Sequence, residues 1–433
     1  TALTAFGTQT GWAVSVPNEL LTGLNSPGVQ GRQAPVSALV TLLAGTGLSY
    51  HITGARSVII QKVAVTSAIQ LGPVRVQGQD EHQANRAIAA YAGGQVAQGA
   101  RMGLFGNRSL MDTPFNVTSY TSRLVADQQA RGLLDVMAND ASVRAEFTET
   151  GFAPDFSIRG FLVSTWDISL DGLFGLIPPQ DASVDFADRI EVLKGPSAFL
   201  NGMPPEGSIG GTINIVPKRA ENPPITRLTF SYLSGSQFGG KTDLGRRFGK
   251  DGAFGVRLNG SYRGGDLAVK RSWEQLGSMA LALDYRSDRF RSSIDLGYER
   301  ETITGSTRPL YLDSGVTVPK APSATSNWLQ PWTRSDVADY YSAFKAEYDL
   351  TRHWTVFATA GLHRNSVSDL ISNPTLIDNN GTISVPTYNF PQQTDVNTEK
   401  VGIHGDFSIF GIKNNLSIDM SRYVSVLSYG LSA

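Results

Sequence analysis

Residues 226–234 read Thr-Arg-Leu-Thr-Phe-Ser-Tyr-Leu-Ser, and their pattern decides the fold of the second half of the chain. Leu228, Phe230 and Tyr232 share one phase of a two-residue period, whereas Arg227 and Thr229 fall between them. Successive side chains of a β-strand point to opposite faces, so this pattern predicts a strand with one apolar face. Similar alternation recurs in stretches that begin at residues 254, 279, 290, 344, 354, 401 and 416.

Two features favour a membrane barrel over a soluble β-sandwich, which also alternates. The alternating stretches run for about ten residues, the length that a tilted strand needs to cross a bilayer. The connections also alternate in length, as expected for short periplasmic turns and long external loops. The short ones are Lys250–Gly252, Arg286–Asp288, Thr351–Arg352 and Gly411–Asn414, and the long ones are Gly264–Gln275, Glu301–Val337 and Arg364–Glu399.

We therefore predict that residues 221–433 form about nine strands of an antiparallel transmembrane β-barrel. The second strand, Gly240–Phe248, is poorly patterned and is inferred from topology. Arg257, Arg291 and Lys345 fall on the polar phase, where they escape the roughly 2–4 kcal/mol that a cation costs on the lipid face. Nine is an odd number of strands, whereas bacterial single-chain barrels have even numbers, and plugged barrels use about 22 strands. We expect a partial barrel that does not insert alone.

The composition excludes several classes of protein. The chain has 433 residues, with 37 Lys and Arg against 38 Asp and Glu, so nothing indicates a nucleic-acid partner. It has no cysteine, which excludes disulfides, thiolate metal sites and cysteine nucleophiles. Apolar runs such as Val36–Gly47 are far shorter than the roughly 20 residues of a membrane helix.

The N-terminal residues 1–63 are predicted to form a small α+β module. Pro35–Leu43 suits a helix, because proline is favoured at the first helical position and Gly45 supplies the stop. Its expected apolar face is Val36, Leu39, Val40 and Leu43, and short strands are expected at Trp12–Val16, Leu48–Ile52 and Ser57–Gln61. Thr1 lies in an apparent helix, so we expect the natural start to lie upstream.

A second globular region precedes the barrel. Gln77–Asn107 is rich in Gly, Ala and Gln and is predicted to be a flexible linker. Phe115–Pro217 is predicted to be a mixed α+β domain, and its position suggests that it fills the barrel. We expect helices at Leu124–Gln129 and Leu133–Met137, and strands at Ile158–Leu162, Ile168–Leu170, Ile190–Leu193 and Thr212–Val216.

Three stretches of this second region resemble the TonB-dependent outer-membrane receptors, in their siderophore branch. Asp188–Gly202 (Asp-Arg-Ile-Glu-Val-Leu-Lys-Gly-Pro-Ser-Ala-Phe-Leu-Asn-Gly), followed by Gly210–Arg219, is similar to the end of the family's plug domain. Ile158–Phe161 (Ile-Arg-Gly-Phe) and Asp112–Phe115 (Asp-Thr-Pro-Phe) resemble earlier plug signatures. Many members carry Arg where this chain has Lys194, which keeps the charge but loses the bidentate fork.

The resemblance implies four domains. Residues 1–63, above all Gly31–Gln61, look like the family's periplasmic signalling domain of the secretin/TonB short N-terminal type. Residues 64–107 are the linker, residues 108–220 the plug and residues 221–433 the incomplete barrel. The TonB box is expected within Leu71–Gln77, where an extended strand would pair with the partner's sheet edge. Its expected residues are Leu71, Val74, Arg75 and Val76.

The function that the resemblance implies is active uptake of a ferric siderophore across the bacterial outer membrane. The expected partners are TonB, an inner-membrane anti-sigma regulator, the ferric siderophore and outer-membrane lipid. We expect no enzyme activity and no protein-bound cofactor or metal, because iron arrives as the ferric siderophore. Haem, cobalamin or a glycan as ligand, and a passive porin or adhesin barrel, are the alternatives.

Candidate ligand residues lie at the expected outer apex of the plug: Arg159, Trp166, Phe174 and Gln180. An aromatic group beside a cation suits a bulky anionic iron chelate, although Trp166 would also serve simply to pack the domain. Tyr311, Trp328 and Trp332 are expected to add an aromatic wall. The charged plug residues Arg159, Glu191, Lys194 and Glu206 are expected to pair with charges of the barrel lumen, since enclosed charges need partners.

Other motifs are weaker. Gly235–Thr242 matches the P-loop pattern, but a helix does not obviously follow it, as phosphate binding would require. A turn between two strands is the alternative to a nucleotide site. Among the five histidines, only His353 and His363 share a predicted element, a strand in which they lie ten residues apart, and we do not expect zinc or triad chemistry. Asp181, Asp185 and Asp188 are expected in solvated loops.

Overall fold

The computed structural model describes residues 2–31, 33–54, 56–62, 88–146, 154–233 and 235–430. The chain divides into two compact units, Thr1–Gly78 and Gln79–Ala433. The expected TonB box at Leu71–Gln77 lies outside the described residues. No helix among those described combines the length and the apolar character needed to cross a membrane.

The N-terminal unit is a small α+β fold, as predicted. Helices α1 (Ala2–Thr10) and α2 (Pro35–Leu43) and a 3₁₀ turn η1 (Asn18–Leu20) accompany a three-stranded sheet. The sheet has the order β1-β3-β2, with β1 parallel and β2 antiparallel to β3. Its strands are β1 (Ala13–Ser15), β2 (Leu48–Gly54) and β3 (Ser57–Lys62), close to the predicted bounds.

Helix α2 has the predicted bounds but buries a different face. Pro35 occupies the first turn, and Gly45 follows the helix with a φ of 74°. The buried side chains of α2 are Ala38, Leu39, Leu42 and Leu43, which pack against Leu3, Phe6, Val58 and Ile60. Val36 and Val40, predicted to face the core, are exposed. The helix is apolar on more than one side, so sequence alone did not define the packed face.

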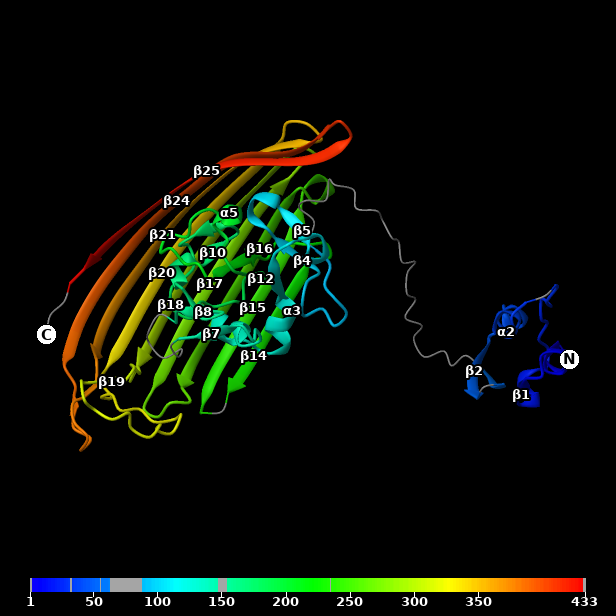
Figure 1. Ribbon diagram of the computed structural model, residues 1–433, viewed down its shortest axis with the longest axis horizontal. Helices are drawn as coiled ribbons and strands as arrows, with labels where there is room; N and C mark the ends of the chain where they lie inside the picture. The colour runs from blue at the N-terminus through cyan, green and yellow to red at the C-terminus, as the bar shows by residue number, and fades with distance from the viewer. Residues whose placement is uncertain are drawn as a thin grey trace. The chain divides into compact units, whose positions relative to one another are not determined.

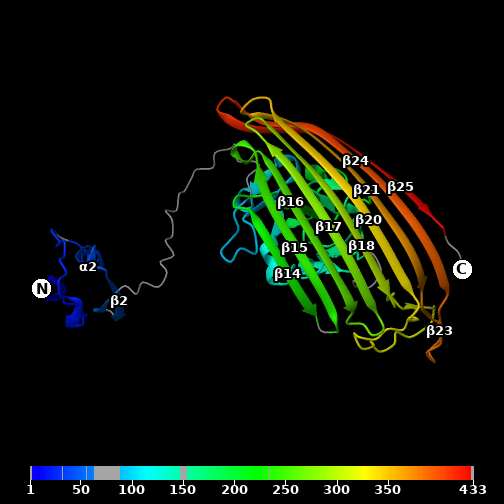
Figure 2. The same ribbon diagram turned by 180° about the vertical axis from the view of Figure 1, so that it is seen from behind.

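The second unit contains a nine-stranded antiparallel sheet in which neighbours along the chain are neighbours in space (Figures 1 and 2). Each strand pairs with the next over most of its length. The strands are β14 (Ile225–Leu233), β15 (Gln237–Phe248), β16 (Phe254–Asp266), β17 (Trp273–Arg286), β18 (Phe290–Thr304), β20 (Arg334–Asp349), β21 (Trp354–Ser372), β24 (Thr387–Ile409) and β25 (Ile412–Tyr429).

The two faces of this sheet follow the alternation in the sequence. Leu228, Phe230 and Tyr232 are exposed, with Phe230 at 86%. Aromatic pairs join adjacent strands on the same outward face, such as Phe254 with Tyr285 and Tyr298 with Tyr340, whose ring centroids lie 4.8 and 4.9 Å apart. An outward apolar band with aromatic residues toward its edges is typical of outer-membrane barrels.

The strands are longer than the predicted ten residues. β21 has 19 residues and β24 has 23, so most of the predicted loop Arg364–Glu399 belongs to these strands. Half of the predicted loop Gly264–Gln275 belongs to β16 and β17. The period-two signal ends there because both faces carry polar residues, as Arg364 and Asn365 do in β21. The backbone ladder needs no apolar face and therefore continues beyond the alternating region.

The connection between β18 and β20 pairs with the connection between β21 and β24. Residues 305–333 contain β19 (Tyr311–Leu312), and residues 373–386 contain β22 (Thr375–Leu376) and β23 (Ile383–Ser384). These three short strands form one sheet in the order β19-β22-β23. At the opposite end the connections are short, and one of them contains the 3₁₀ turn η6 (Lys250–Gly252).

Residues 88–220 form a compact body, here called the inner domain, which lies against the inward face of the large sheet (Figure 1). Its main sheet has the order β11-β10-β13-β12-β6, and smaller sheets are β7-β8-β9 and β4-β5. The strands are β4 (Gly99–Arg101), β5 (Asn107–Ser109), β6 (Asn116–Thr121), β7 (Val143–Ala145), β8 (Phe156–Ile158), β9 (Phe161–Val163), β10 (Ser169–Leu170), β11 (Leu173–Phe174), β12 (Ala187–Lys194) and β13 (Gly211–Pro217). The helices are α3 (Ser122–Asp127), α4 (Leu133–Met137) and α5 (Ala198–Asn201), with 3₁₀ turns η3 (Gly103–Phe105), η4 (Leu110–Asp112) and η5 (Thr165–Asp167).

Two predictions for this domain are wrong. Residues 88–107, expected to be linker, carry β4, and their Ala100 and Met102 are buried against Leu193 and Leu200. Ile158–Leu162, expected to be one strand, turns between β8 and β9. Arg159 and Gly160 have φ of 53° and 84°, values that end an extended strand.

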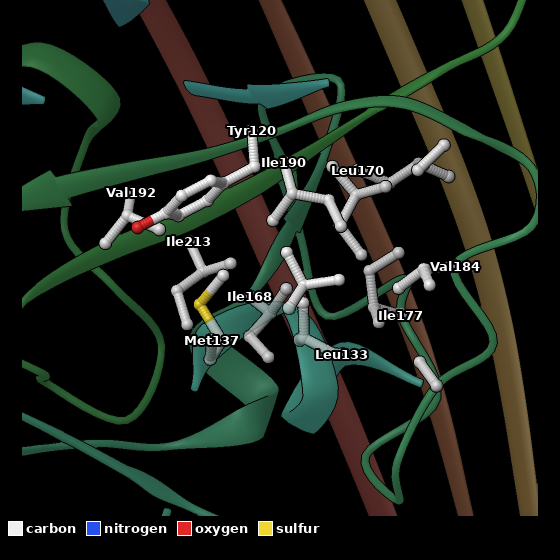
Figure 3. Packing of buried hydrophobic residues seen from close by; sticks show 14 of the residues in the cluster. Tyr120, Leu133, Met137, Ile168, Leu170, Ile177, Val184, Ile190, Val192 and Ile213 are labelled. Atoms are coloured by element: carbon white, nitrogen blue, oxygen red, sulfur yellow. The ribbon is translucent and has the colours of Figure 1, made fainter. Parts of the chain in front are cut away.

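The core of the inner domain reaches the large sheet. Figure 3 shows Tyr120, Leu133, Met137, Ile168 and Leu170 packed among the apolar residues of the central strands. Tyr341 and Ala343 of β20 belong to the same buried cluster. The domain and the sheet therefore share part of one apolar core.

The outward face of β18 offers a test of its lipid contact. Ile294 lies midway between the outward Phe290 and Tyr298, whereas Thr302 lies in the same phase beyond Arg300. Ile294→Arg is expected to destabilise the folded protein in membranes by about 2–4 kcal/mol, because the cation meets hydrocarbon. Thr302→Arg is expected to cost no more than about 1 kcal/mol near the interface. Urea midpoints in lipid vesicles measure both, and equal effects would contradict the assignment.

Candidate functional site: the contact between the inner domain and the sheet

An ion pair joins the end of the inner domain to the middle of the sheet. Arg219 follows β13, and its two terminal nitrogens each lie 2.7 Å from an oxygen of Asp295 on β18. The Asp295 side chain is only 9% exposed. A bidentate pair of this kind is stronger and more directional than a single hydrogen bond, so it fixes the domain against β18.

A second cluster surrounds Asp243 on β15. Arg257 of β16 donates to both carboxylate oxygens at 2.6 and 2.8 Å, and Lys218 Nζ lies 3.4 Å from the same group. Burial lowers the pKa of the Lys218 ammonium, while the Asp243 and Asp185 carboxylates oppose that shift. Lys241 of β15 pairs in the other direction with Asp185 of the inner domain, at 2.8 Å. The inner domain therefore supplies the cation of one ion pair with the sheet and the carboxylate of another.

A third link passes through Asp171, in the turn between β10 and β11. Its carboxylate pairs with Arg101 of β4, and its second oxygen lies 3.6 Å from Lys345 Nζ on β20. Lys345 also contacts Glu347 at 2.9 Å. Burial lowers the pKa of Arg101, against the raising effect of the Glu347 and Glu191 carboxylates. Asp171 thus connects the first strand of the domain to the sheet.

Backbone groups of the inner domain also bind the sheet. The N–H of Ser183 donates to Glu299 of β18 at 3.1 Å, and Ser278 of β17 donates to the Ser183 hydroxyl at 3.3 Å. Gly361 of β21 lies so close to Leu176 that a Cβ at this position would overlap the leucine side chain. The loop between β11 and β12 therefore rests directly on the sheet.

The predicted charge network between plug and barrel is wrong in its residues. Lys194 pairs with Asp140 at 2.8 Å, within the inner domain. Burial raises the pKa of Asp140, but hydrogen bonds from Lys194 and Ser142 and the Lys194 charge outweigh it and lower that pKa. Glu191 accepts the N–H of Arg101 and the amide of Asn214, both at 2.9 Å, and its burial raises its pKa. These charges satisfy each other inside the domain.

The remaining two predicted network residues make backbone hydrogen bonds inside the domain, and the Glu206 charge also acts on Tyr423 of β25. The backbone N–H of Glu206 donates to Asp167 at 2.8 Å, and the backbone N–H of Arg159 donates to the carbonyl of Ser142 at 2.8 Å. Within the described ranges, no ion pair joins either side chain to the large sheet. The pairs that do cross the contact involve Asp171, Asp185, Lys218 and Arg219. Asp185 was expected in a solvated loop, and the motif Gly210–Arg219 did not indicate that its last two residues bind the sheet.

The predicted ligand residues are only partly brought together. Trp166 is half-buried, with its ring 5.8 Å from the ring of His363 on β21. Gly175, next to Phe174, also contacts His363, through its carbonyl oxygen at 2.8 Å. Phe174 is 8% exposed. Arg159 is exposed at the β8–β9 turn, and no contact between it and Trp166 is described. His363 therefore contacts one predicted ligand residue, Trp166, and the backbone next to another, Phe174. The sequence did not indicate this role of His363.

The two long connections form a polar and aromatic rim. Arg308 pairs with Asp369 at 2.9 Å, and the indole N–H of Trp328 donates to the Arg308 carbonyl at 3.2 Å. Tyr311 and Trp332 are 49% and 45% exposed. Tyr311 and Trp332 therefore have surface available for an aromatic contact, whereas Trp328 is engaged in holding the loop.

The alternative sites do not form. Gly235 and Ser236 make a turn, and the rest of Gly235–Thr242 lies in strand β15, so no helix follows the glycines. The nucleotide alternative is therefore wrong. His353 pairs with Asp406 at 2.9 Å in an exposed position, apart from the buried His363. No group of three or more potential ligands able to hold a metal occurs in the described part of the chain.

Residues 109–212 match the family described as TonB-dependent Receptor Plug Domain. The ferrichrome receptor FcuA of Yersinia enterocolitica is 38% identical over 335 residues, which are 77% of this chain and 44% of FcuA. The inner domain is therefore a plug domain of the TonB-dependent receptor type, as the resemblance implied.

Solved structures give the same assignment. BauA, the ferric preacinetobactin receptor from Acinetobacter baumannii, has a TM-score of 0.77 and 35% identity, over 79% of this chain and 51% of BauA. The ferripyoverdine receptor of the outer membrane of Pseudomonas aeruginosa has a TM-score of 0.69 over 99% of this chain and 55% of that protein. At 17% identity this last likeness shows the fold alone. The chain spans about half the length of the relatives it matches, and these relatives are receptors rather than enzymes.

The Arg219–Asp295 pair leads to a quantitative prediction. Asp295→Asn leaves Arg219 partly buried without a counter-charge, at an expected cost near the lower end of about 3–5 kcal/mol. The matched control is Asp336→Asn on β20, whose partners Arg300 and Arg334 are both 55% exposed and whose loss is expected to cost about 1 kcal/mol or less. Hydrogen exchange of residues 187–217 measures how firmly the plug is held. Equal protection in the two variants would contradict the assigned role.

Proposed function

We propose that this chain, whose residues 109–212 are a TonB-dependent receptor plug domain, acts in TonB-driven uptake of a ferric siderophore across the bacterial outer membrane. The observation that carries the proposal is the packing of this plug on the polar face of a sheet whose other face is apolar. The 38% identity with a ferrichrome receptor supports it. The iron enters as part of the siderophore, and no protein-bound cofactor is required.

The ligand class is inferred from the relatives and the apex. The two relatives above 30% identity receive ferrichrome and ferric preacinetobactin, both iron chelates. We assign Arg159, Trp166, Phe174 and Gln180 to the ligand side of the plug. Trp166 offers a half-buried indole and Arg159 an exposed cation, a combination that suits an anionic chelate. Haem, cobalamin or a glycan is the alternative ligand.

The polar contact between plug and sheet suits a plug that moves. Water can replace the partners of Asp295, Asp243 and Asp171 when the contact opens, so little apolar surface is exposed there. The outer membrane has no ion gradient of its own, and the work would come through TonB. We assign the TonB contact to Leu71–Gln77, which would add a strand to the partner's sheet edge on binding.

The N-terminal residues 1–63 are proposed to lie in the periplasm and to signal ligand binding to an inner-membrane anti-sigma regulator. They form a compact unit separate from the plug and sheet, which suits an independent role. A passive outer-membrane barrel remains the competing function. It differs in one respect that is easily measured, because its transport does not depend on TonB.

Uptake is tested by the growth of an iron-starved host that lacks its own receptors. A panel of purified ferric siderophores, including a ferrichrome, is expected to contain one that restores growth only when TonB is present. Deleting Leu71–Gln77 is expected to abolish growth while the affinity for that siderophore stays within about twofold, because the segment contains none of the residues assigned to the ligand. Growth that persists without TonB would support the passive barrel instead.

Signalling is tested by removing the N-terminal unit. Deletion of residues 1–63 is expected to abolish siderophore-dependent induction of the receptor's own promoter and to leave uptake of radioactive iron unchanged. The two roles are expected to separate because the unit has its own core around Leu39 and Ile60. Loss of uptake in this variant, with normal amounts of protein in the membrane, would refute the separation.

A further inference from the structure

His363 of β21 is buried between the sheet and the plug. Its side chain has no exposed surface. Nδ1 lies 2.8 Å from the carbonyl oxygen of Gly175, and Nε2 lies 2.8 Å from Oδ1 of Asp339 on β20. The ring also lies 5.8 Å from the ring of Trp166. One residue of the sheet therefore contacts both Trp166 and the loop that follows Phe174.

The two hydrogen bonds of His363 require an additional proton. A carbonyl oxygen only accepts, so Nδ1 must carry a hydrogen. A neutral imidazole would then turn the lone pair of Nε2 toward Asp339, and an ionised carboxylate has no hydrogen to donate. The contact is satisfied only when one proton lies between Nε2 and Oδ1. Asn365 donates its amide to the same Oδ1 at 2.9 Å and holds that oxygen in place.

We propose that His363 is a positioning residue of the ligand site, and that the proton it shares with Asp339 holds the loop 173–180 and Trp166 in their binding arrangement. The siderophore part of this proposal rests on the proposed function, whereas the contact with the loop does not. His363 itself touches no ligand. It acts through the backbone of Gly175 and the ring of Trp166.

The backbone of the loop is confined on two sides. Gly175 has a φ of 74°, and a Cβ there would lie 2.7 Å from the ring of Tyr423 on β25. Leu176 rests on Gly361, which lies two residues before His363 on the same face of β21. The loop therefore sits between β21 and β25, and the hydrogen bond from His363 fixes its position.

The charged groups near His363 are mostly acidic. They are Asp339 of β20, Glu299 of β18, on which the charge of Asp339 acts, and Asp395 of β24, on which the charge of His363 acts. Arg364 is exposed and engages Asp395 at 2.6 Å. Without the shared proton, the Nε2 lone pair would face a carboxylate, and the contact with Asp339 would be repulsive.

The chain supplies a matched control. His353 also pairs with a carboxylate, its Nδ1 lying 2.9 Å from Asp406, but its side chain is 60% exposed and this pair belongs to the sheet alone. His353→Gln therefore removes a histidine–carboxylate pair without touching the plug. Asp339→Asn provides a rescue that needs no shared proton, since its amide can donate to Nε2 of a neutral His363. Asn365, whose side-chain oxygen has no partner in the wild-type arrangement, can flip its amide and accept the second hydrogen of the new NH2 group.

The first measurement is the hydrogen-exchange protection factor of residues 173–180 in the full-length protein at pH 6. Wild type and His353→Gln are expected to protect the loop equally. His363→Gln is expected to exchange about tenfold faster, as for the loss of one hydrogen bond. Asp339→Asn is expected to stay protected. Equal loss in Asp339→Asn and His363→Gln, or in both histidine variants, would overturn the proposal.

The second measurement is the affinity for the ferric siderophore that supports growth. His363→Gln is expected to bind about tenfold more weakly, and Asp339→Asn within about twofold of wild type at pH 6. Exchange that follows the predicted pattern with unchanged affinity would overturn the role in ligand binding. If no siderophore binds the wild type, the proposed function fails, and the exchange data still decide whether the proton holds the loop.

Discussion

The structure depends on pairing the charges that the sheet turns inward. A strand in a bilayer can place cations and carboxylates only on the face away from lipid, and once that face is covered, each buried charge needs a partner. The Arg219–Asp295 pair is the clearest case, with two contacts of 2.7 Å. The plug domain is therefore held in place by the same polar phase that allows the sheet to face lipid on its other side.

The plug is held in two physically different ways. Its own interior is apolar, with Ile168, Leu170, Ile190 and Ile213 fully buried. Its contact with the sheet is mainly ionic, apart from a small apolar patch at Tyr341 and Ala343. The interior of the plug and its contact with the sheet therefore rest on different interactions, namely apolar packing and buried ion pairs.

Local signals predicted local structure well. The alternation at Leu228–Tyr232 identified a strand and its outward face, and α2 and α4 have the predicted bounds. Strand ends were missed where both faces become polar, as after Arg364. Residues 88–107 were taken for linker because they contain few large side chains. The small Ala100 is nevertheless buried with Met102 beneath Leu200.

The partners of charged residues were beyond the reach of sequence patterns. Asp295 lies 76 positions from Arg219, and His363 lies 188 positions from Gly175. Lys194 was assigned to the barrel wall because its motif is charged, yet it pairs with Asp140 inside the plug. A motif indicates that a charge is needed, but only the three-dimensional arrangement shows which group satisfies it. The plug was therefore recognisable, whereas its contacts with the sheet were not.

A covalent link between the plug and the sheet tests most directly whether the plug must move against the sheet for iron to be imported. This chain has no cysteine, and the hydroxyl oxygens of Ser183 and Ser278 lie 3.3 Å apart, close enough for the double variant Ser183→Cys/Ser278→Cys to form a disulfide. The oxidised variant is expected to bind the ferric siderophore normally and to import no iron, and reduction of the disulfide is expected to restore import. Import at the wild-type rate with the disulfide intact would contradict the claim that the plug must move against the sheet.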